Sequence, residues 1–153
     1  MYEKVENEGE SMKMVFGEMI PGLNYRKRKG VYAIAFHHEK DQVLVVRNET
    51  GHYFLPGGGM EGDESQVECL ERELMEETGY RGTIGSYVGN AMRYFLTRKE
   101  EPLLSDAFFY QVELNEKVQE QSEHVTEWID LEEASQLLFH EHHDWAVKKA
   151  IDM

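Results

Sequence analysis

The sequence predicts one α/β domain, and three observations support this class. The chain has 153 residues, which is close to the usual length of one compact domain. Short apolar runs typical of buried strands recur between residues 31 and 114, and a helical pattern of apolar residues covers 65–78. Because Cys69 is the single cysteine, the chain can form neither an intramolecular disulfide nor a zinc site built on a cysteine pair.

The N-terminal segment differs from the rest of the chain in composition. Residues 1–11 are polar and rich in glutamate, with too little apolar area to offset the entropy of ordering. We therefore expect a flexible acidic arm over 1–11 and a single domain over 12–153, beginning with an edge strand in which Met12, Met14 and Phe16 alternate. We expect no secretory signal, and no stretch approaches the roughly 20 apolar residues that span a bilayer.

Apolar runs separated by turn residues predict the strands in the first half of the chain. We expect strands over 31–36, 43–46 and 53–55, with a hairpin connection at 39–42. The run Pro56-Gly57-Gly58-Gly59 follows, and we expect it to abolish regular structure.

The second half is expected to contain three helices. In the first, over 65–78, Val67, Leu70 and Leu74 form one apolar stripe, and Gly79 is the expected stop. Later elements are predicted as strands over 84–96, 107–114 and 127–129, a helix from 131 capped by Asp130, and a last helix over 144–151.

Acidic residues are concentrated in one short segment. Glu61 to Glu77 contains eight acids and one arginine, a net charge of −7, which is half of the chain's −14 in 17 residues. On a helix Glu73, Glu76 and Glu77 project within an arc of about 100°. Like charges at these spacings cost about 0.2–0.5 kcal/mol per pair, so the cluster predicts a bound cation, and hard oxygen ligands suit Mg²⁺ or Mn²⁺.

Two neighbours complete this candidate metal site. Arg72 is the only cation of the segment; it can reach back to Glu64 or forward to Glu76, and we expect it to orient carboxylates. The glycine run lets the backbone approach a ligand closely and supplies carbonyl oxygens, such as that of Gly57, as further metal ligands. A solvated acidic helix face behind a glycine loop is the alternative that such residues alone leave open.

The spacing of residues over the whole segment 58–80 is more specific than the acidic cluster alone. Gly58, five residues, Glu64, seven residues and then Arg72-Glu73-Leu74-x-Glu76-Glu77-x-Gly79-Tyr80 resembles the complete Nudix box without a departure. The resemblance implies the Nudix fold, an α/β fold in which a mixed β-sheet is sandwiched between α-helices. It extends over about residues 12–150, although only the box, residues 58–80, is highly specific.

The resemblance also implies an activity. Nudix hydrolases cleave a nucleoside diphosphate linked to another moiety, using divalent cations that neutralise phosphate charge and activate the attacking water. It assigns Glu73, Glu76 and Glu77 as catalytic metal ligands, with Gly58, Glu64 and Arg72 orienting the box. Relatives often add an acid from a late loop as metal ligand or base; our candidate is Glu123, with Glu120 second, against a plain solvated loop acid.

Some subgroups of the family carry additional sequence signatures that mark their substrate, and this sequence has none of those considered. The choice of substrate is therefore narrowed only by exclusion. The first proline after the box is Pro102, and no Ser-Gln-Pro array follows the box. The leading hypothesis is hydrolysis of a nucleoside triphosphate, with oxidised purine nucleotides as one candidate, to monophosphate and pyrophosphate. An ADP-ribose or dinucleoside polyphosphate hydrolase is the alternative, and a non-catalytic nucleotide sensor is an alternative of another class.

Other polar clusters carry weaker signals. The cationic run 26–29 is interpreted as a solvated strand entrance rather than a phosphate contact. His140, His142 and His143 resemble a metal tract, but a polar cap and turn at a helix start is the preferred interpretation. Cys69 is expected to pack and not to act as a nucleophile.

Charge and composition limit the partners. A formal charge of −14 argues against general nucleic-acid binding, which depends on Lys and Arg. We expect a cytoplasmic protein with a small nucleotide substrate and no membrane partner; monomer and homodimer both remain open.

Overall fold

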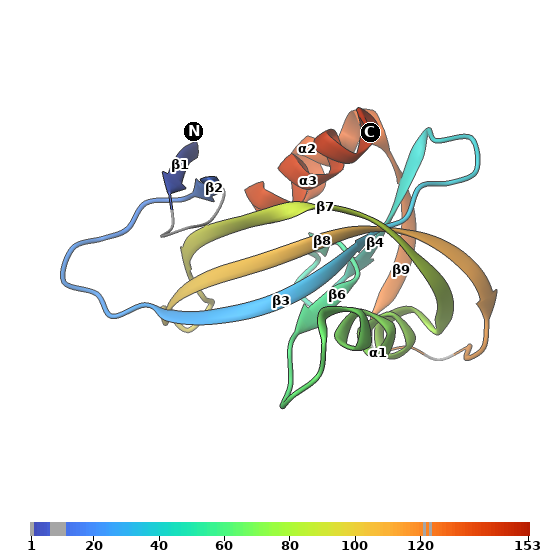
Figure 1. Cartoon of the computed structure of the whole chain (residues 1–153), viewed down its shortest axis with the longest axis horizontal. Helices are drawn as coiled ribbons and strands as arrows, with labels where there is room; N and C mark the ends of the chain where they lie inside the picture. Colours follow the sequence, from blue (N-terminus) through green and yellow to red (C-terminus); the bar gives the residue numbers. More distant parts are fainter. Residues whose placement is uncertain (1, 7–11, 121, 123) are drawn as a thin grey trace.

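A computed structural model describes residues 2–6, 12–120, 122 and 124–153. Its strands form a six-stranded sheet in the order β1-β2-β7-β8-β3-β6 and a three-stranded sheet in the order β5-β4-β9 (Figure 1). The strands are β1 (Tyr2–Glu6), β2 (Met12–Phe16), β3 (Arg26–Ile34), β4 (Gln42–Arg47), β5 (Tyr53–Phe54), β6 (Gly57–Gly59), β7 (Tyr80–Leu96), β8 (Pro102–Lys117) and β9 (Val125–Asp130), and the helices are α1 (Gln66–Thr78), α2 (Leu131–Leu137) and α3 (Glu141–Ile151).

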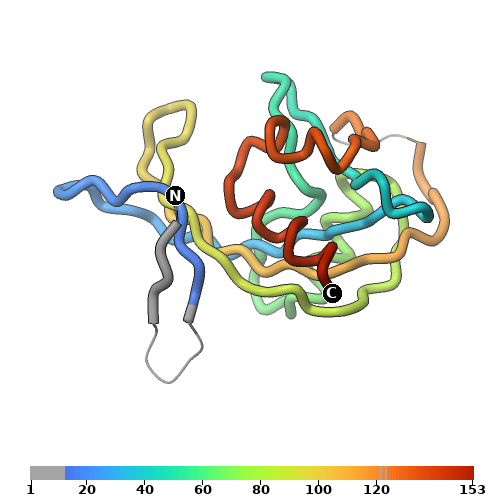
Figure 2. The backbone as a smooth tube through the Cα atoms, turned by 90° about the horizontal axis from the view of Figure 1, so that it is seen from above, coloured from blue at the N-terminus to red at the C-terminus, as the bar shows by residue number. Residues whose placement is uncertain are grey.

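The larger sheet is mixed, as expected. Strands β7 and β8 form a long antiparallel pair, whereas β3 runs parallel to β8 and β2 runs parallel to β7. These four strands extend beyond the region that the helices cover (Figures 1 and 2). At that uncovered end the residues 26–29 of β3 are all exposed.

Helices cover both faces of the larger sheet, which confirms the predicted α/β/α arrangement. Side chains alternate along β3, so Val31 and Ala33 pack against the buried face of α1, whereas Ile34 joins the core beneath α3. Figure 2 shows α3 crossing the strands. The site therefore lies where α1, on one face, reaches the short edge strand β6.

Two segments contradict the sequence-based expectations of irregular structure. Gly57–Gly59 does not abolish regular structure but forms β6, antiparallel to β3, because a chain without side chains fits between β3 and α1. Of the arm predicted over 1–11, residues 2–6 form β1, antiparallel to β2. Backbone pairing to an open sheet edge needs little apolar side-chain area; residues 1 and 7–11 lie outside the described part of the chain.

Helix α1 begins and ends as its sequence predicts. Ser65 and Glu68 form a capping box, and Gly79 ends the helix in the left-handed conformation at φ 77°. The expected apolar stripe is shifted, since Val67 is 41% exposed and Cys69 takes its place beside Leu70 and Leu74 in the core.

The C-terminal helices differ in detail from the prediction. Helix α3 begins at Glu141 rather than Asp144, one turn earlier. Asp130 occupies the N-cap position of α2 without capping it; its Oδ1 instead accepts a hydrogen bond from Nε2 of Gln42, at 3.1 Å.

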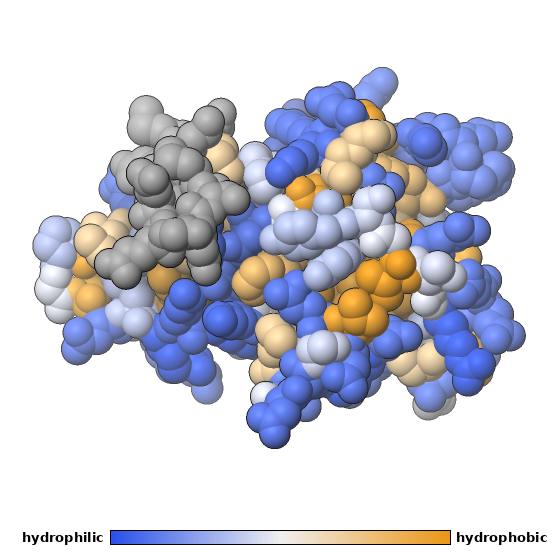
Figure 3. Space-filling view, in the orientation of Figure 1, coloured by the Kyte–Doolittle hydropathy of each residue, from blue (hydrophilic) through white to orange (hydrophobic). Residues whose placement is uncertain are grey.

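The face of the molecule seen in Figure 3 is largely polar. On the face shown in Figure 3, hydrophilic side chains predominate and apolar ones form small separate patches. Within the described ranges, no helix combines the length and the apolar character needed to cross a membrane.

Candidate active site

The carboxylates of α1 lie against the glycines of β6. The Gly57 N–H donates to Oε1 of Glu77 at 2.7 Å. A Cβ atom on Gly58 would come within 2.6 Å of the Glu73 carboxyl carbon. Strand β6 can therefore approach the acidic face of α1 only because these positions lack side chains.

Arg72 donates hydrogen bonds to three carboxylates, and the Glu61 carboxylate lies 3.9 Å from its Nε. Its Nη1 donates to Glu73 Oε1 at 2.9 Å and to Glu76 Oε2 at 3.3 Å. Its Nη2 and Nε donate to the two oxygens of Glu64 at 2.7 and 3.1 Å, and Nη2 also donates to the carbonyl of Gly59 at 3.1 Å. The arginine thus contacts both expected partners, Glu64 and Glu76, at once.

The charges of this network shift the ionisation of its members. Hydrogen bonds from Arg72 lower the pKa of Glu64 to about 2, assisted by the Glu61 N–H. The same contacts raise the pKa of Arg72 above its usual value. Both side chains therefore stay charged at neutral pH. This maintains the two hydrogen bonds from Arg72, on the helix, to Glu64, in the loop before α1.

The donor set suits a divalent cation. A single guanidinium already bonds Glu73 and Glu76, so these carboxylates can converge on one cation, and with Glu77 they offer the hard oxygen donors that Mg²⁺ and Mn²⁺ prefer. As they stand, however, no three Asp, Glu, His or Cys side chains among the described residues form a metal-binding group. Binding an ion here requires Glu73 and Glu76 to turn toward it from Arg72.

A histidine that sequence reasoning did not select contacts this cluster. Nε2 of His124 lies 3.4 Å from Oε2 of Glu77. The neighbouring candidate Glu123 lies outside the described residues, and Glu120 points to solvent, 4.0 Å from Lys117. A single histidine in an acidic loop belongs to no motif, so the sequence did not identify it. It directly follows the candidate Glu123 in the chain.

Cys69 packs as expected. Its side chain is fully buried, and its thiol lies 3.6 and 3.7 Å from the carbonyl oxygens of Gly58 and Gly59. Burial raises the pKa of the thiol to about 12. A thiol that stays protonated does not serve as a nucleophile.

One member of the cationic run comes close to β6. A Cβ atom on Gly59 would lie 2.6 Å from Nε of Arg28, so the guanidinium covers that glycine. The neighbouring Tyr32 is half-buried, and desolvation raises its pKa to about 12 against the opposing charge of Arg28. Glu77 and Glu73 also raise that pKa, so Tyr32 lies within electrostatic range of Arg28 and of the box carboxylates.

The C-terminal histidines are neither a metal tract nor a polar cap. His142 and His143 are 0% and 1% exposed, and the three imidazole rings lie 4.9–5.2 Å apart. His140 occupies the N-cap position without capping, and its Nδ1 lies 2.7 Å from Nη1 of Arg93. The His142 Nε2 faces the Ser105 hydroxyl at 3.0 Å, and Nδ1 of His143 accepts from the Leu55 N–H at 3.2 Å.

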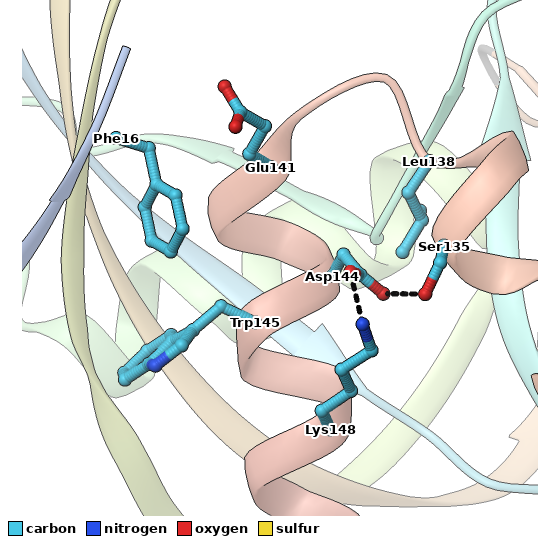
Figure 4. A pocket seen from close by; sticks show the side chains of 7 residues that line it. All are labelled: Phe16, Ser135, Leu138, Glu141, Asp144, Trp145 and Lys148. Carbon is cyan, nitrogen blue, oxygen red and sulfur yellow. Dashed lines mark hydrogen bonds and ion pairs between the residues drawn. The ribbon is translucent and has the colours of Figure 1, made fainter. Parts of the chain in front are cut away.

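A hollow of about 240 Å³ lies on the other side of the larger sheet. Figure 4 shows Phe16 and Trp145 on one side of α3 and Asp144, which bonds Ser135 and Lys148, on the other; all five line the hollow. None of its lining residues belongs to α1 or β6, so it is separate from the acidic cluster.

The chain resembles known proteins over most of its length. A family model described as the NUDIX domain matches residues 26–150. A Bacillus subtilis (strain 168) protein provisionally named 8-oxo-dGTP diphosphatase is 33% identical over 61 residues, which cover 40% of this chain and 41% of that protein. Human diphosphoinositol polyphosphate phosphohydrolase 3-alpha is 26% identical over 119 residues, covering 72% of this chain and 69% of the relative.

Solved structures show the same architecture. The crystal structure of a mutator MutT protein from Bacillus halodurans superimposes with a TM-score of 0.66 at 25% identity, covering 82% of this chain and 83% of that one. The mixed sheet and the helices that cover it are thus arranged as in a known fold. With the family model extending from Arg26 to Ala150, the chain belongs to the Nudix hydrolase family.

Proposed function

We propose that this protein is a divalent-metal-dependent pyrophosphohydrolase that cleaves a nucleoside diphosphate linked to another moiety. The observation that carries the proposal is the convergence of Glu73 and Glu76 on one cationic group beside β6, with Glu77 fixed by the Gly57 N–H. These carboxylates outnumber the one guanidinium, and their oxygen donors suit a hard divalent cation and the phosphate chemistry of the family.

The residues have distinct roles in this proposal. Glu73, Glu76, Glu77 and the carbonyl of Gly57 would hold Mg²⁺ or Mn²⁺, which when bound supplies charge neutralisation and activates the attacking water. Arg72 keeps Glu73 near Glu76, because its Nη1 contacts both carboxylates. Residues of β6 approach the reacting phosphates without side chains in the way.

Arg28 is our candidate for contact with the substrate phosphates. Its guanidinium lies over Gly59, and Arg26 to Lys29 are exposed. By contrast, Arg72 already bonds several acceptors. An exposed guanidinium can bind phosphate oxygens through two hydrogen bonds.

For the substrate, we favour a nucleoside triphosphate, hydrolysed to the monophosphate and pyrophosphate. The relative provisionally named 8-oxo-dGTP diphosphatase supports this choice and makes oxidised purine nucleotides a candidate. The diphosphoinositol relative points to a different substrate class. A net charge of −14 favours the substrate with fewer phosphates.

The test is product analysis over a substrate panel. Nucleoside triphosphates, 8-oxo-dGTP, ADP-ribose, a dinucleoside polyphosphate and a diphosphoinositol polyphosphate are incubated with Mg²⁺, with Mn²⁺ or with EDTA. We expect metal-dependent release of pyrophosphate from a triphosphate, and loss of most turnover in Glu76→Gln and Glu77→Gln with the fold intact. Tight nucleotide binding without turnover of any compound would favour the sensor alternative, and unchanged turnover in both variants would exclude the metal assignment.

Several expectations stay predictions. They are the role of Glu123, the cytoplasmic location and the choice between monomer and homodimer.

A further inference from the structure

Both carboxylate oxygens of Glu77 are contacted from outside α1. Oε1 accepts the Gly57 N–H of β6 at 2.7 Å, and Oε2 lies 3.4 Å from Nε2 of His124. The two contacts come from segments more than 60 residues apart in the chain. One carboxylate of the acidic cluster is therefore held between a strand and the connection that leads from β8 to β9.

That connection is attached to the C-terminal end of α1. The N–H groups of Val118 and Gln119 donate to the Gly79 carbonyl at 2.8 and 3.2 Å. The packing is close, since a Cβ atom on Gly79 would lie 2.2 Å from the Gln119 carbonyl oxygen. At the other end of the connection, the Ser122 hydroxyl donates to the His124 carbonyl at 2.8 Å. One end of the connection that carries the imidazole, at Val118 and Gln119, is thus attached to the end of the helix that carries Glu77.

Burial makes the orientation of this carboxylate depend on protein partners. The Glu77 side chain is 10% exposed, whereas the His124 side chain that contacts it is 32% exposed. A carboxylate with so little solvent access cannot rely on water for its orientation. Partners of metal-ligating groups commonly fix their geometry in this way.

We propose that His124 is a positioning residue that orients Glu77 for the divalent ion. The inference rests on the proposed function, because it assigns His124 a role only if Glu77 binds a metal. The imidazole contacts Oε2 of Glu77, so its effect is expected through that carboxylate.

The experiment measures Mn²⁺ affinity without substrate, from the electron paramagnetic resonance signal of free Mn²⁺. We expect His124→Ala to weaken binding by about 10- to 100-fold, the usual effect of removing such a partner. His124→Gln retains an N–H donor and should stay within about threefold of the wild type. His38→Ala, whose imidazole is 77% exposed, is the matched control and should bind as the wild type does.

The outcomes separate this inference from the proposed function. Wild-type affinity in His124→Ala overturns the positioning role, and so does a His124→Gln variant as weak as the alanine variant. Absence of Mn²⁺ binding by the wild type overturns the proposed function and this inference with it. Urea unfolding of the metal-free variants must show unchanged stability, because a loss matching the loss of affinity would make the effect structural and also overturn the inference.

Discussion

Lowering the pH from about 7.5 to about 5.5 should destabilise the fold through the three buried histidines. Burial lowers the pKa of His140 to about 3 and, with the neighbouring cations, lowers those of His142 and His143 well below the usual value. In the unfolded chain each imidazole has its ordinary pKa of about 6.5. The stability that these three neutral imidazoles contribute is thus fully present above about pH 6.5. It is lost as the pH falls toward about 3, since only the unfolded chain takes up the protons.

The magnitude follows from proton linkage. If an imidazole stays neutral in the fold, the change from about pH 7.5 to about 5.5 costs about 1.4 kcal/mol per histidine. Three such groups give about 4 kcal/mol, a large part of the roughly 5–15 kcal/mol of a typical domain. The pKa of Glu64, lowered to about 2, contributes only at more acidic pH. Relief of the repulsion within the acidic chain acts in the opposite direction.

Urea unfolding in EDTA at both pH values measures this loss as a change in midpoint at constant slope. His140→Phe is the informative variant, because the rings of Phe95, Phe139 and Phe54 lie 4.8–5.4 Å from that imidazole. Its pH-dependent loss should be about 1.4 kcal/mol smaller than that of the wild type, whereas the exposed His38→Gln should match the wild type. An identical pH dependence in His140→Phe and the wild type would refute the reasoning.

Three further substitutions test the site and its supports. Gly58→Ala places a Cβ 2.6 Å from the Glu73 carboxyl carbon; displacement of that flexible group should lower kcat on the order of 100-fold with little change in urea midpoint. Gly79→Ala combines a φ of 77° with a Cβ 2.2 Å from the Gln119 carbonyl oxygen, so the free energy of unfolding should fall by at least about 1–2 kcal/mol; wild-type stability would contradict this. Arg72→Lys keeps the charge but loses the planar fork, and titration should show Mn²⁺ affinity about tenfold weaker; unchanged affinity would show that the fork does not organise the carboxylates.

Local patterns were sufficient to predict α1 and the acidic cluster. The stop at Gly79 and the spacing of the glutamates both act within a few turns of one helix, where sequence distance and spatial distance agree. The contacts of Arg72 with Glu64 and Glu76 follow for the same reason.

Contacts between distant segments could not be predicted in this way. His142 and His143 are polar residues at a helix start, yet they are buried, and Ser105 and the Leu55 N–H each partner one ring nitrogen. The glycine run becomes a strand only because β3 offers its edge. The approach of His124 to Glu77 likewise depends on how β8 leads into β9.

Arg72 has a consequence for the protein without its ion. Because a side chain of the helix itself balances Glu73 and Glu76, departure of a metal would not leave these acids facing only one another. If the cluster binds a divalent ion as proposed, the folded chain keeps these charges balanced with or without it. The supply of the ion, rather than the stability of the chain, would then limit the amount of active enzyme.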